Sequence, residues 1–456
     1  RVPGACEGRA TASAAMQRAI SEGGILTRQK ALAERTCDDD SCSGPQTPPG
    51  SQRRRQRANS IPGNCRLINP KVGPLRTVGK LAQLFFRVSW WLGLPGRWFL
   101  QVARLLIFAS LMMPFFIPFL MRYLSSPDIR KNVVYGPSIR HQLDVFLPCG
   151  TSEQKAPVVI FFCGGAWIIG YKLWAYIMGQ FFHLQGVLFI APDYRNFPQV
   201  TIGGMVEDVA RVVHWTLDHI DTLNGDPGNV TLMGQSCGAH ITLLALLEQV
   251  NKEVSLKRQQ LQPQQLQKRS RSETDLDAPP SWSPRLLKRW IGISGPYDLL
   301  DLIPSLHARG LHSSVLRALL EKDVPGYSPH RIVRDLAMSE QRGPAVNLLP
   351  QVNLFHGTAD ATVDYRQSER LAEVLEQAGA KVTCRLYKGK SHTDPILEDA
   401  CRGAGDQLME DLLRLILPDG PADASSTLAA GQLPMSWIRQ RGRELLLQLA
   451  RLINPF

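Results

Sequence analysis

A serine between two glycines is the residue of this sequence best suited to nucleophilic chemistry. The run VTLMGQSCGAHITLLAL contains the pattern G-x-S-x-G, with Ser236 between Gly234 and Gly238. The apolar residues before the pattern predict a strand, and the periodic residues from Cys237 predict a helix. A sharp turn between them needs small neighbours so that the hydroxyl projects, and the helix N-terminus favours developing negative charge. The pattern therefore predicts a nucleophile at Ser236, with a plain glycine-rich turn as the alternative.

A serine at neutral pH is a poor nucleophile without a base and a carboxylate that orients the base. The run VNLFHGTAD predicts a strand and then a loop, with Asp360 at the end of the strand. The run KVTCRLYKGKSHTDP predicts the next strand, and the loop after it carries His392. Ser236, Asp360 and His392 thus follow one another in the order of an α/β-hydrolase catalytic triad.

Other acids and histidines are weaker candidates for these roles. Asp364 lies four residues after the expected acid and fits a loop or a helix start, and Asp394 follows the expected histidine too closely to orient it. His240 lies one turn beyond the nucleophile, where a histidine more often packs than catalyses. His356 ends a predicted strand ahead of a glycine.

The negative charge that develops on the substrate must be held by backbone donors. The run FFCGGAWIIGY places Gly164, Gly165 and Ala166 after a predicted buried strand, where lipases and esterases carry their H-G-G-G motif. Small residues let backbone amides approach the substrate oxygen, although a strand-end turn also uses glycine pairs. The amide of Cys237 is the expected second donor. Its thiol is expected to be a small filler, because the turn presents the preceding residue.

Strands and helices alternate through the part of the chain that carries these residues. Apolar runs predict strands at 142–147, 157–163, 187–191, 230–233, 290–294, 352–355 and 381–387. Helices are predicted at 205–220, from 237 onward and at 367–378. This alternation predicts a mostly parallel sheet covered on both faces. We therefore expect an α/β class catalytic domain with the α/β-hydrolase fold at 132–418, interrupted by a disordered polar insertion at 251–289.

The formal net charge of +12 lies in two polar segments. Residues 1–80 contain 14 Lys and Arg against 6 Asp and Glu, and residues 251–289 contain 9 against 4, so the rest of the chain is close to neutral. Residues 1–79, with the low-complexity run GPQTPPGSQRRRQRANSIPGN, predict a disordered basic arm. No basic domain with interleaved aromatic residues accompanies the charge, so we expect no nucleic-acid binding.

Residues 80–124 predict one or two N-terminal membrane helices. The stretch 105–121, LLIFASLMMPFFIPFLM, carries no charge and has the minimum length of a spanning helix. The apolar, aromatic stretch 81–100 precedes it, so the alternatives are a two-helix hairpin, one span with an interfacial segment, or a buried helix of a soluble domain. Basic residues flank the region on both sides and predict that the flanks and the catalytic domain face the cytosol: Arg53, Arg54, Arg55, Arg57, Lys71, Arg76 and Lys80 before it, and Arg122, Arg130 and Lys131 after it.

The C-terminal stretch 436–456, SWIRQRGRELLLQLARLINPF, interleaves arginines with leucines at helical spacing. It predicts a basic amphipathic helix for an anionic membrane surface. A helix docked on the hydrolase is the alternative.

The nine cysteines show no C-x-x-C pair and no regular four-ligand spacing, so we expect reduced intracellular thiols and no metal site. The predicted triad needs no cofactor, and none is expected.

Several runs together resemble a known family: CGGAWIIGYKLW, APDYRNFPQ, LMGQSCGAHI, HGTAD and YKGKSHTDPI. They resemble the isoprenylcysteine methylesterases, membrane-bound α/β-hydrolases similar to hormone-sensitive lipase, over about residues 85–415. The resemblance implies hydrolysis of the methyl ester of a prenylcysteine, free or at a protein C-terminus, with membrane lipid as a partner. It also implies a location in endoplasmic reticulum or Golgi membranes. On this match, Ser236, Asp360 and His392 fall on the family's triad, and residues 164–166 fall on its oxyanion loop.

The sequence departs from the family pattern at three places. Cys237 stands where Ala is usual, Cys163 stands where such esterases often have His or Thr, and the insertion at 251–289 is not a recognised family feature. None of these departures removes a catalytic group, although the side chain of Cys237 is expected to narrow the pocket.

Four further residues are candidates for contact with the substrate: Trp167, Trp174, Phe197 and Gln235. The three aromatic side chains are equally compatible with a place in the core. Two other enzymes would use the same triad, a broader carboxylesterase and a hydrolase of the kynurenine formamidase type. A hydrolase-fold protein that only binds a ligand or partner would lack part of the triad, and here all three residues are present.

Overall fold

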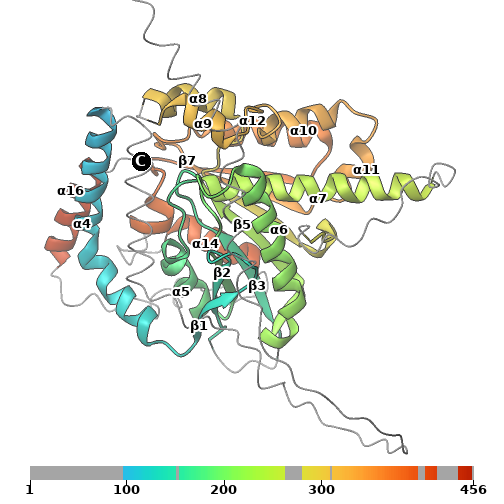
Figure 1. Cartoon of the computed structure of the whole chain (residues 1–456). Helices are drawn as coiled ribbons and strands as arrows, with labels where there is room; N and C mark the ends of the chain where they lie inside the picture. The colour runs from blue at the N-terminus through green and yellow to red at the C-terminus, as the bar shows by residue number, and fades with distance from the viewer. Residues whose placement is uncertain are drawn as a thin grey trace, which may run out of the picture. The chain divides into compact units, whose positions relative to one another are not determined.

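The structure is a computed structural model of the chain, and it describes residues 96–149, 154–261, 280–308, 311–398, 406–417 and 440–453 (Figure 1). The basic arm predicted at 1–79 lies outside these residues. So do the first residues of the predicted membrane segment, 80–95, and the central part of the predicted insertion, 262–279.

An eight-stranded sheet organises the described part of the chain, in the order β1-β2-β4-β3-β5-β6-β7-β8. The first two pairings, β1 with β2 and β2 with β4, are antiparallel, and all the others are parallel. The strands are β1 Ile129–Val134, β2 Gln142–Phe146, β3 Ala156–Phe162, β4 Leu188–Pro192, β5 Gly225–Gln235, β6 Arg289–Ile293, β7 Gln351–Gly357 and β8 Val382–Tyr387. This sheet, with helices between its parallel strands, confirms the predicted α/β-hydrolase fold. Strand β1 was not predicted, because three consecutive polar residues interrupt its sequence IRKNVV and it lies at an edge of the sheet.

Helices cover both faces of the sheet. The longer ones are α4 Gly96–Ser125, α5 Tyr176–Leu184, α6 Ile202–His219, α7 Cys237–Leu261, α8 Leu299–Ala308, α10 Pro329–Ala337, α12 Arg366–Ala378, α14 Gln407–Ile416 and α16 Gln440–Ile453. The shorter ones are η1 Lys172–Ala175, η2 Asp221–Leu223, η4 Pro284–Leu286, α9 Ser313–Leu319, α11 Arg342–Val346 and the π-helix η5 Asp394–Glu398. Helices α8 to α11 lie between β6 and β7, a stretch for which no element was predicted.

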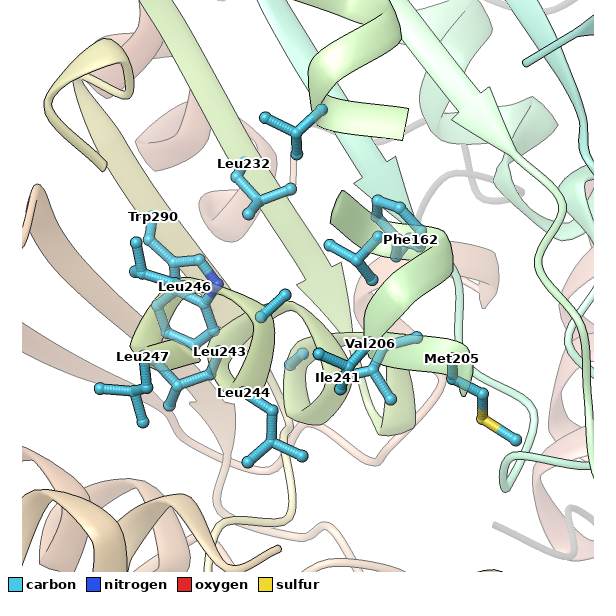
Figure 2. Packing of buried hydrophobic residues seen from close by; sticks show 14 of the residues in the cluster. Phe162, Met205, Val206, Leu232, Ile241, Leu243, Leu244, Leu246, Leu247 and Trp290 are labelled. Carbon is cyan, nitrogen blue, oxygen red and sulfur yellow. The ribbon is translucent and has the colours of Figure 1, made fainter. Parts of the chain in front are cut away.

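Strand β3 shows how the two faces are built. Val158, Ile160 and Phe162 belong to a cluster with α6, α7 and α12, whereas Val159 and Phe161 belong to a second cluster with α4, α5 and α14. Successive side chains of a strand point to opposite faces, so a strand covered on both sides is apolar throughout. Figure 2 shows the first cluster, where Trp290 of β6 lies among the leucines of α7.

Helix α7 corrects the predicted start of the disordered insertion. It continues to Leu261, so residues 251–261 are helical rather than disordered. The ion pairs Glu248–Lys252 and Glu253–Lys257 have the i,i+4 spacing that supports a helix in polar sequence, and Val254 is buried. The predicted end of the insertion, at residue 289, also lies too late in the sequence, because Trp282 is buried against the core and β6 begins at Arg289.

Helix α4 is long and apolar enough to cross a membrane over Ala103–Ser125. One of its faces nevertheless packs on the domain that contains the sheet, since Phe115 and Phe119 are buried in the second cluster and Phe119 meets the ring of Tyr176 edge-on. Its other face exposes large apolar side chains: Leu106, Ile107, Met113, Ile117, Leu120, Met121 and Leu124. Residues 96–104 continue the same helix, so no break separates them from the predicted span at 105–121.

Helix α16 lies beside α4 (Figure 1) and buries Leu447 and Ala450 in the same cluster. It exposes Leu445, Leu449 and Leu452. The helix predicted at 436–456 is thus present at Gln440–Ile453, docked through one face and apolar on another.

Candidate active site

Ser236 occupies the sharp turn between β5 and α7. Its φ is +55°, in the left-handed region, and its amide donates to the carbonyl of Ile293 on β6 at 2.8 Å. A Cβ at Gly238 would lie 2.1 Å from the carbonyl oxygen of Phe162, and one at Gly234 would lie 2.5 Å from the amide of Ala239. The glycines of the motif are therefore required by close approach of neighbouring backbone, as a nucleophile elbow demands.

The structure brings the three predicted triad residues together. Asp360 follows β7 and His392 follows β8, so both lie at the sheet edge where the parallel strands end, as does Ser236. The Nε2 atom of His392 is 2.9 Å from the Oγ atom of Ser236, and its Nδ1 atom is 2.6 Å from Oδ2 of Asp360. All three residues are buried.

The surroundings of Asp360 keep its carboxylate ionised. Burial acts to raise its pKa, but the charge of His392 and hydrogen bonds from His356 and His392 outweigh burial and hold the pKa well below its usual range. The Oδ1 atom also accepts the amides of Thr362 and Val363, at 2.8 and 2.9 Å. An ionised carboxylate only accepts hydrogen bonds, so Nδ1 of His392 carries the hydrogen and Nε2 is left to take a proton from Ser236.

The rival acids lie elsewhere. Asp364 is exposed and pairs with Arg366 at 3.1 Å. Asp394 is buried, and its Oδ2 atom accepts the amide of Ser391 at 2.8 Å. Asp394 thus shapes the loop that carries His392.

His240 packs beneath the site. Its Nδ1 atom accepts the indole N–H of Trp167 at 3.2 Å, and its Nε2 atom donates to the carbonyl of Tyr327 at 2.7 Å. Burial lowers the pKa of His240 to about 4, so its ring is neutral at physiological pH.

The loop after β3 offers the oxyanion donors. Gly165, Ala166 and Trp167 have φ values of +141°, +50° and +61°, so three successive residues depart from the usual regions. Among the residues that the structure describes, the amide of Ala166 makes no backbone hydrogen bond and is available to a substrate oxygen, whereas the amide of Cys237 lies against its own thiol. The amide of Gly164 is not available, because it donates to Oε1 of Gln235 at 3.2 Å. Gly164 follows β3 in the loop where it was predicted, and its missing Cβ lets Gln235 and Ser236 approach.

Cys237 supports this loop. Its Sγ atom accepts the amide of Trp167 at 3.2 Å and lies 3.6 Å from the hydroxyl of Tyr194. Burial raises the pKa of the thiol. The thiol therefore stays protonated and holds the backbone that follows the oxyanion donors.

Comparison with known proteins assigns the chain to a family. Residues 143–375 match the BD-FAE family. The probable isoprenylcysteine alpha-carbonyl methylesterase ICME of Oryza sativa subsp. japonica is 38% identical over 378 residues, 82% of this chain and 84% of that protein. The isoprenylcysteine alpha-carbonyl methylesterase ICME of Arabidopsis thaliana is 36% identical over 376 residues, 82% of this chain and 81% of that protein. The chain belongs to the isoprenylcysteine alpha-carbonyl methylesterase family.

As a member of this methylesterase family, the chain is a carboxylic ester hydrolase. Among solved structures it is similar to the propionate-bound Est2 esterase of the planctomycete Thermogutta terrifontis. The two are 19% identical with a TM-score of 0.42, over 64% of this chain and 96% of the esterase. In the part of the chain that is described, no group of three or more His, Cys, Asp or Glu side chains is placed to hold a metal ion.

The four residues predicted to contact the substrate differ in how far they are exposed to solvent. Trp167 is 3% exposed and packs in the core against His240, and Phe197 is half-buried against the same core. Trp174 is 45% exposed, and its indole N–H donates to the carbonyl of Ile169. None of these contacts tests a role in substrate binding.

Gln235, the fourth of these residues, lies between two loops of the site. It is buried, and besides accepting the amide of Gly164 it donates from Nε2 to the carbonyl of His392 at 3.5 Å. One side chain thus joins the oxyanion loop to the histidine loop.

Sequence reasoning missed a second histidine at the triad. His356 of β7 lies 3.1 Å from the Oδ2 atom of Asp360. The signal was present, because the two residues are four apart across a strand end in the run HGTAD.

Proposed function

We propose that this hydrolase removes the methyl group from the α-carboxyl methyl ester of a prenylcysteine, leaving the free carboxylate and methanol. The proposal rests above all on the two relatives described above, which are named for this reaction and align with more than four-fifths of the chain. The hydrogen-bonded set of Ser236, His392 and Asp360 supplies the chemistry that such an ester requires.

The reaction proceeds by acyl transfer. His392 takes the proton of Ser236 as Oγ attacks the ester carbonyl, and Asp360 holds the imidazole in the required tautomer. The amides of Ala166 and Cys237 stabilise the oxyanion. Methanol leaves with the proton from His392, and water activated by the same imidazole then hydrolyses the acyl-enzyme.

We also propose that the enzyme works at an endoplasmic reticulum or Golgi membrane, with its catalytic domain facing the cytosol. The exposed apolar faces of α4 and α16 and the basic residues around them support this location. A prenylated substrate partitions into the same interface, so the enzyme and its substrate would meet there. In sealed microsomes, protease added outside should digest the catalytic domain; full protection would reject the orientation.

Hydrolysis of farnesylcysteine methyl ester by the full-length protein in detergent tests the substrate. Release of the free acid is expected, and it should be lost in Ser236→Ala. Ser294→Ala is the matched control, because Ser294 also has a positive φ, +51°, and is buried at the end of the neighbouring strand β6. This control variant should keep wild-type activity.

Short acyl esters and N-formylkynurenine serve as competing substrates in the same assay. A preference for either of them over the prenylcysteine ester by kcat/KM would reject the proposed substrate class. Turnover that survives in Ser236→Ala would reject the mechanism.

A further inference from the structure

The carboxylate of the triad is shared by two imidazoles. His356 Nε2 is 3.1 Å from Asp360 Oδ2, the oxygen that lies 2.6 Å from His392 Nδ1. The side chains of His356 and Asp360 are fully buried. Water therefore cannot replace either contact without rearrangement, and the two rings compete for the electron density of one oxygen.

The partners of His356 identify which of its nitrogens carries the hydrogen. Its Nε2 atom also lies 3.0 Å from the carbonyl oxygen of Val363. Both of these partners are acceptors, so Nε2 is the donor. The Nδ1 atom lies 2.7 Å from the hydroxyl of Ser368 on α12, which is itself buried and can donate to Nδ1 when Nε2 alone carries the hydrogen. Hydrogen bonds therefore run from Ser368 through His356 to Asp360, opposite the bond from His392.

Other charged groups near the triad are engaged in contacts of their own. Asp394, on the histidine loop, accepts the amide of Ser391. On the loop after β7, Asp364 pairs with Arg366, and on the loop after β8 Lys390 pairs with Asp406 at 3.0 Å. Asp360 itself is bound by His392, His356 and two backbone amides.

We propose that His356 is a positioning residue that tunes the basicity of His392 through their shared carboxylate oxygen, and that Ser368 fixes the tautomer that makes this possible. A donor on Oδ2 draws negative charge away from the imidazolium that His392 becomes during the reaction. Loss of the His356 donor should therefore let the carboxylate hold the proton of that imidazolium more strongly. The inference rests on the proposed triad, but not on the identity of the ester.

The test measures how fast a fluorophosphonate labels Ser236 as a function of pH, with the full chain in detergent. In His356→Phe, the acidic limb of the labelling profile should move to higher pH by about half to one unit. Labelling on the acidic side should then be roughly three to ten times slower. A limb that stays in place, even with a lower plateau, or one that moves to lower pH would overturn the proposal.

His183→Phe is the matched control. His183 is also buried, and its Nδ1 atom contacts the carbonyl of Leu147, away from the triad. The same loss of a buried imidazole there should leave the limb where it is; a shift in this control equal to that of His356→Phe would overturn a specific effect of His356.

Ser368→Ala keeps the proposal testable if His356→Phe does not fold. It should move the limb in the same direction by less, because the ring of His356 remains but loses the donor that fixes its tautomer. In a foldable double variant, Ser368→Ala should add nothing to His356→Phe. No shift in the single variant, or full additivity in the double, would overturn the proposal. Failure of the triad itself would be distinct, because wild-type protein would then not be labelled at Ser236.

Discussion

Replacement of Asp360 by asparagine should show how much of the catalysis depends on the tautomer of His392. In the wild type, Oδ1 accepts two backbone amides and Oδ2 accepts two imidazole donors. An asparagine has one acceptor oxygen and one NH₂ group in place of the two carboxylate oxygens. In either orientation, its NH₂ group therefore faces either the two backbone amides or the two imidazole N–H groups, which are also donors. With the oxygen on the backbone amides, Nδ1 of His392 must become an acceptor and its hydrogen moves to Nε2. The ring then cannot accept the proton of Ser236.

The size of the loss distinguishes tautomer reversal from the loss of one hydrogen bond. Loss of a single charge-assisted hydrogen bond costs about 1.5–3 kcal/mol, which is about 10- to 150-fold in rate. Loss of the required tautomer lowers kcat by about 10⁴-fold, or about 5.4 kcal/mol. We therefore expect Asp360→Asn to lose on the order of 10⁴ in kcat at neutral pH.

The assay is hydrolysis of farnesylcysteine methyl ester, with circular dichroism as a check on folding. Asp364→Asn is the matched control, four residues along the same loop and exposed to solvent, and it should keep wild-type kcat. Folded Asp360→Asn protein that loses no more than about 150-fold in kcat would refute the reasoning, because one lost hydrogen bond would explain that loss. Equal losses in the two variants would refute it as well.

Three further predictions test the supports of the site. Gln235→Met removes the tether between the oxyanion and histidine loops, so kcat should fall by about 10-fold with little change in KM; unchanged kcat would mean that the tether is dispensable. Tyr123→Phe removes the hydroxyl that donates to buried Asp144 at 2.6 Å. The free energy of unfolding measured in urea should fall by about 1–2 kcal/mol. An unchanged free energy of unfolding would show that this hydrogen bond makes no net contribution to stability. Because folding lowers the pKa of Asp360, its ionisation stabilises the fold above about pH 4, the usual value for an aspartate, and this stability is lost as the pH falls further. The stability gap between wild type and Asp360→Asn should therefore shrink below about pH 4, and a constant gap would contradict this linkage.

The residues of the triad could be found from sequence because each follows a strand with a strong local signal. All three signals are short-range patterns. Ser236 lies between two glycines, Asp360 lies in a loop after an apolar run, and His392 follows the last predicted strand. The core strands were likewise predictable, since burial on both faces makes them apolar throughout. Edge strand β1 and helices α8 to α11 lack such runs, and their positions depend on tertiary packing.

The supports of the triad could not be found in this way. Gln235 joins two loops whose sequence separation exceeds 150 residues, so no short-range sequence pattern predicts its contacts. The sequence places Gly164 in the oxyanion loop, but only the structure shows that its amide donates to Gln235. The length of α7 was missed because a polar composition was taken for disorder, although its ion pairs have helical spacing.

The packing of α4 has a consequence for how this enzyme could be shortened. Phe115 and Phe119 share a cluster with α5 and the sheet, and Tyr123 donates to Asp144, which also pairs with buried Lys172. A chain cut after α4 would expose the apolar surface around Tyr176 and remove one partner from a buried carboxylate. The apolar helix is thus part of the catalytic domain's own core, and its removal would leave a protein prone to aggregate rather than a soluble esterase.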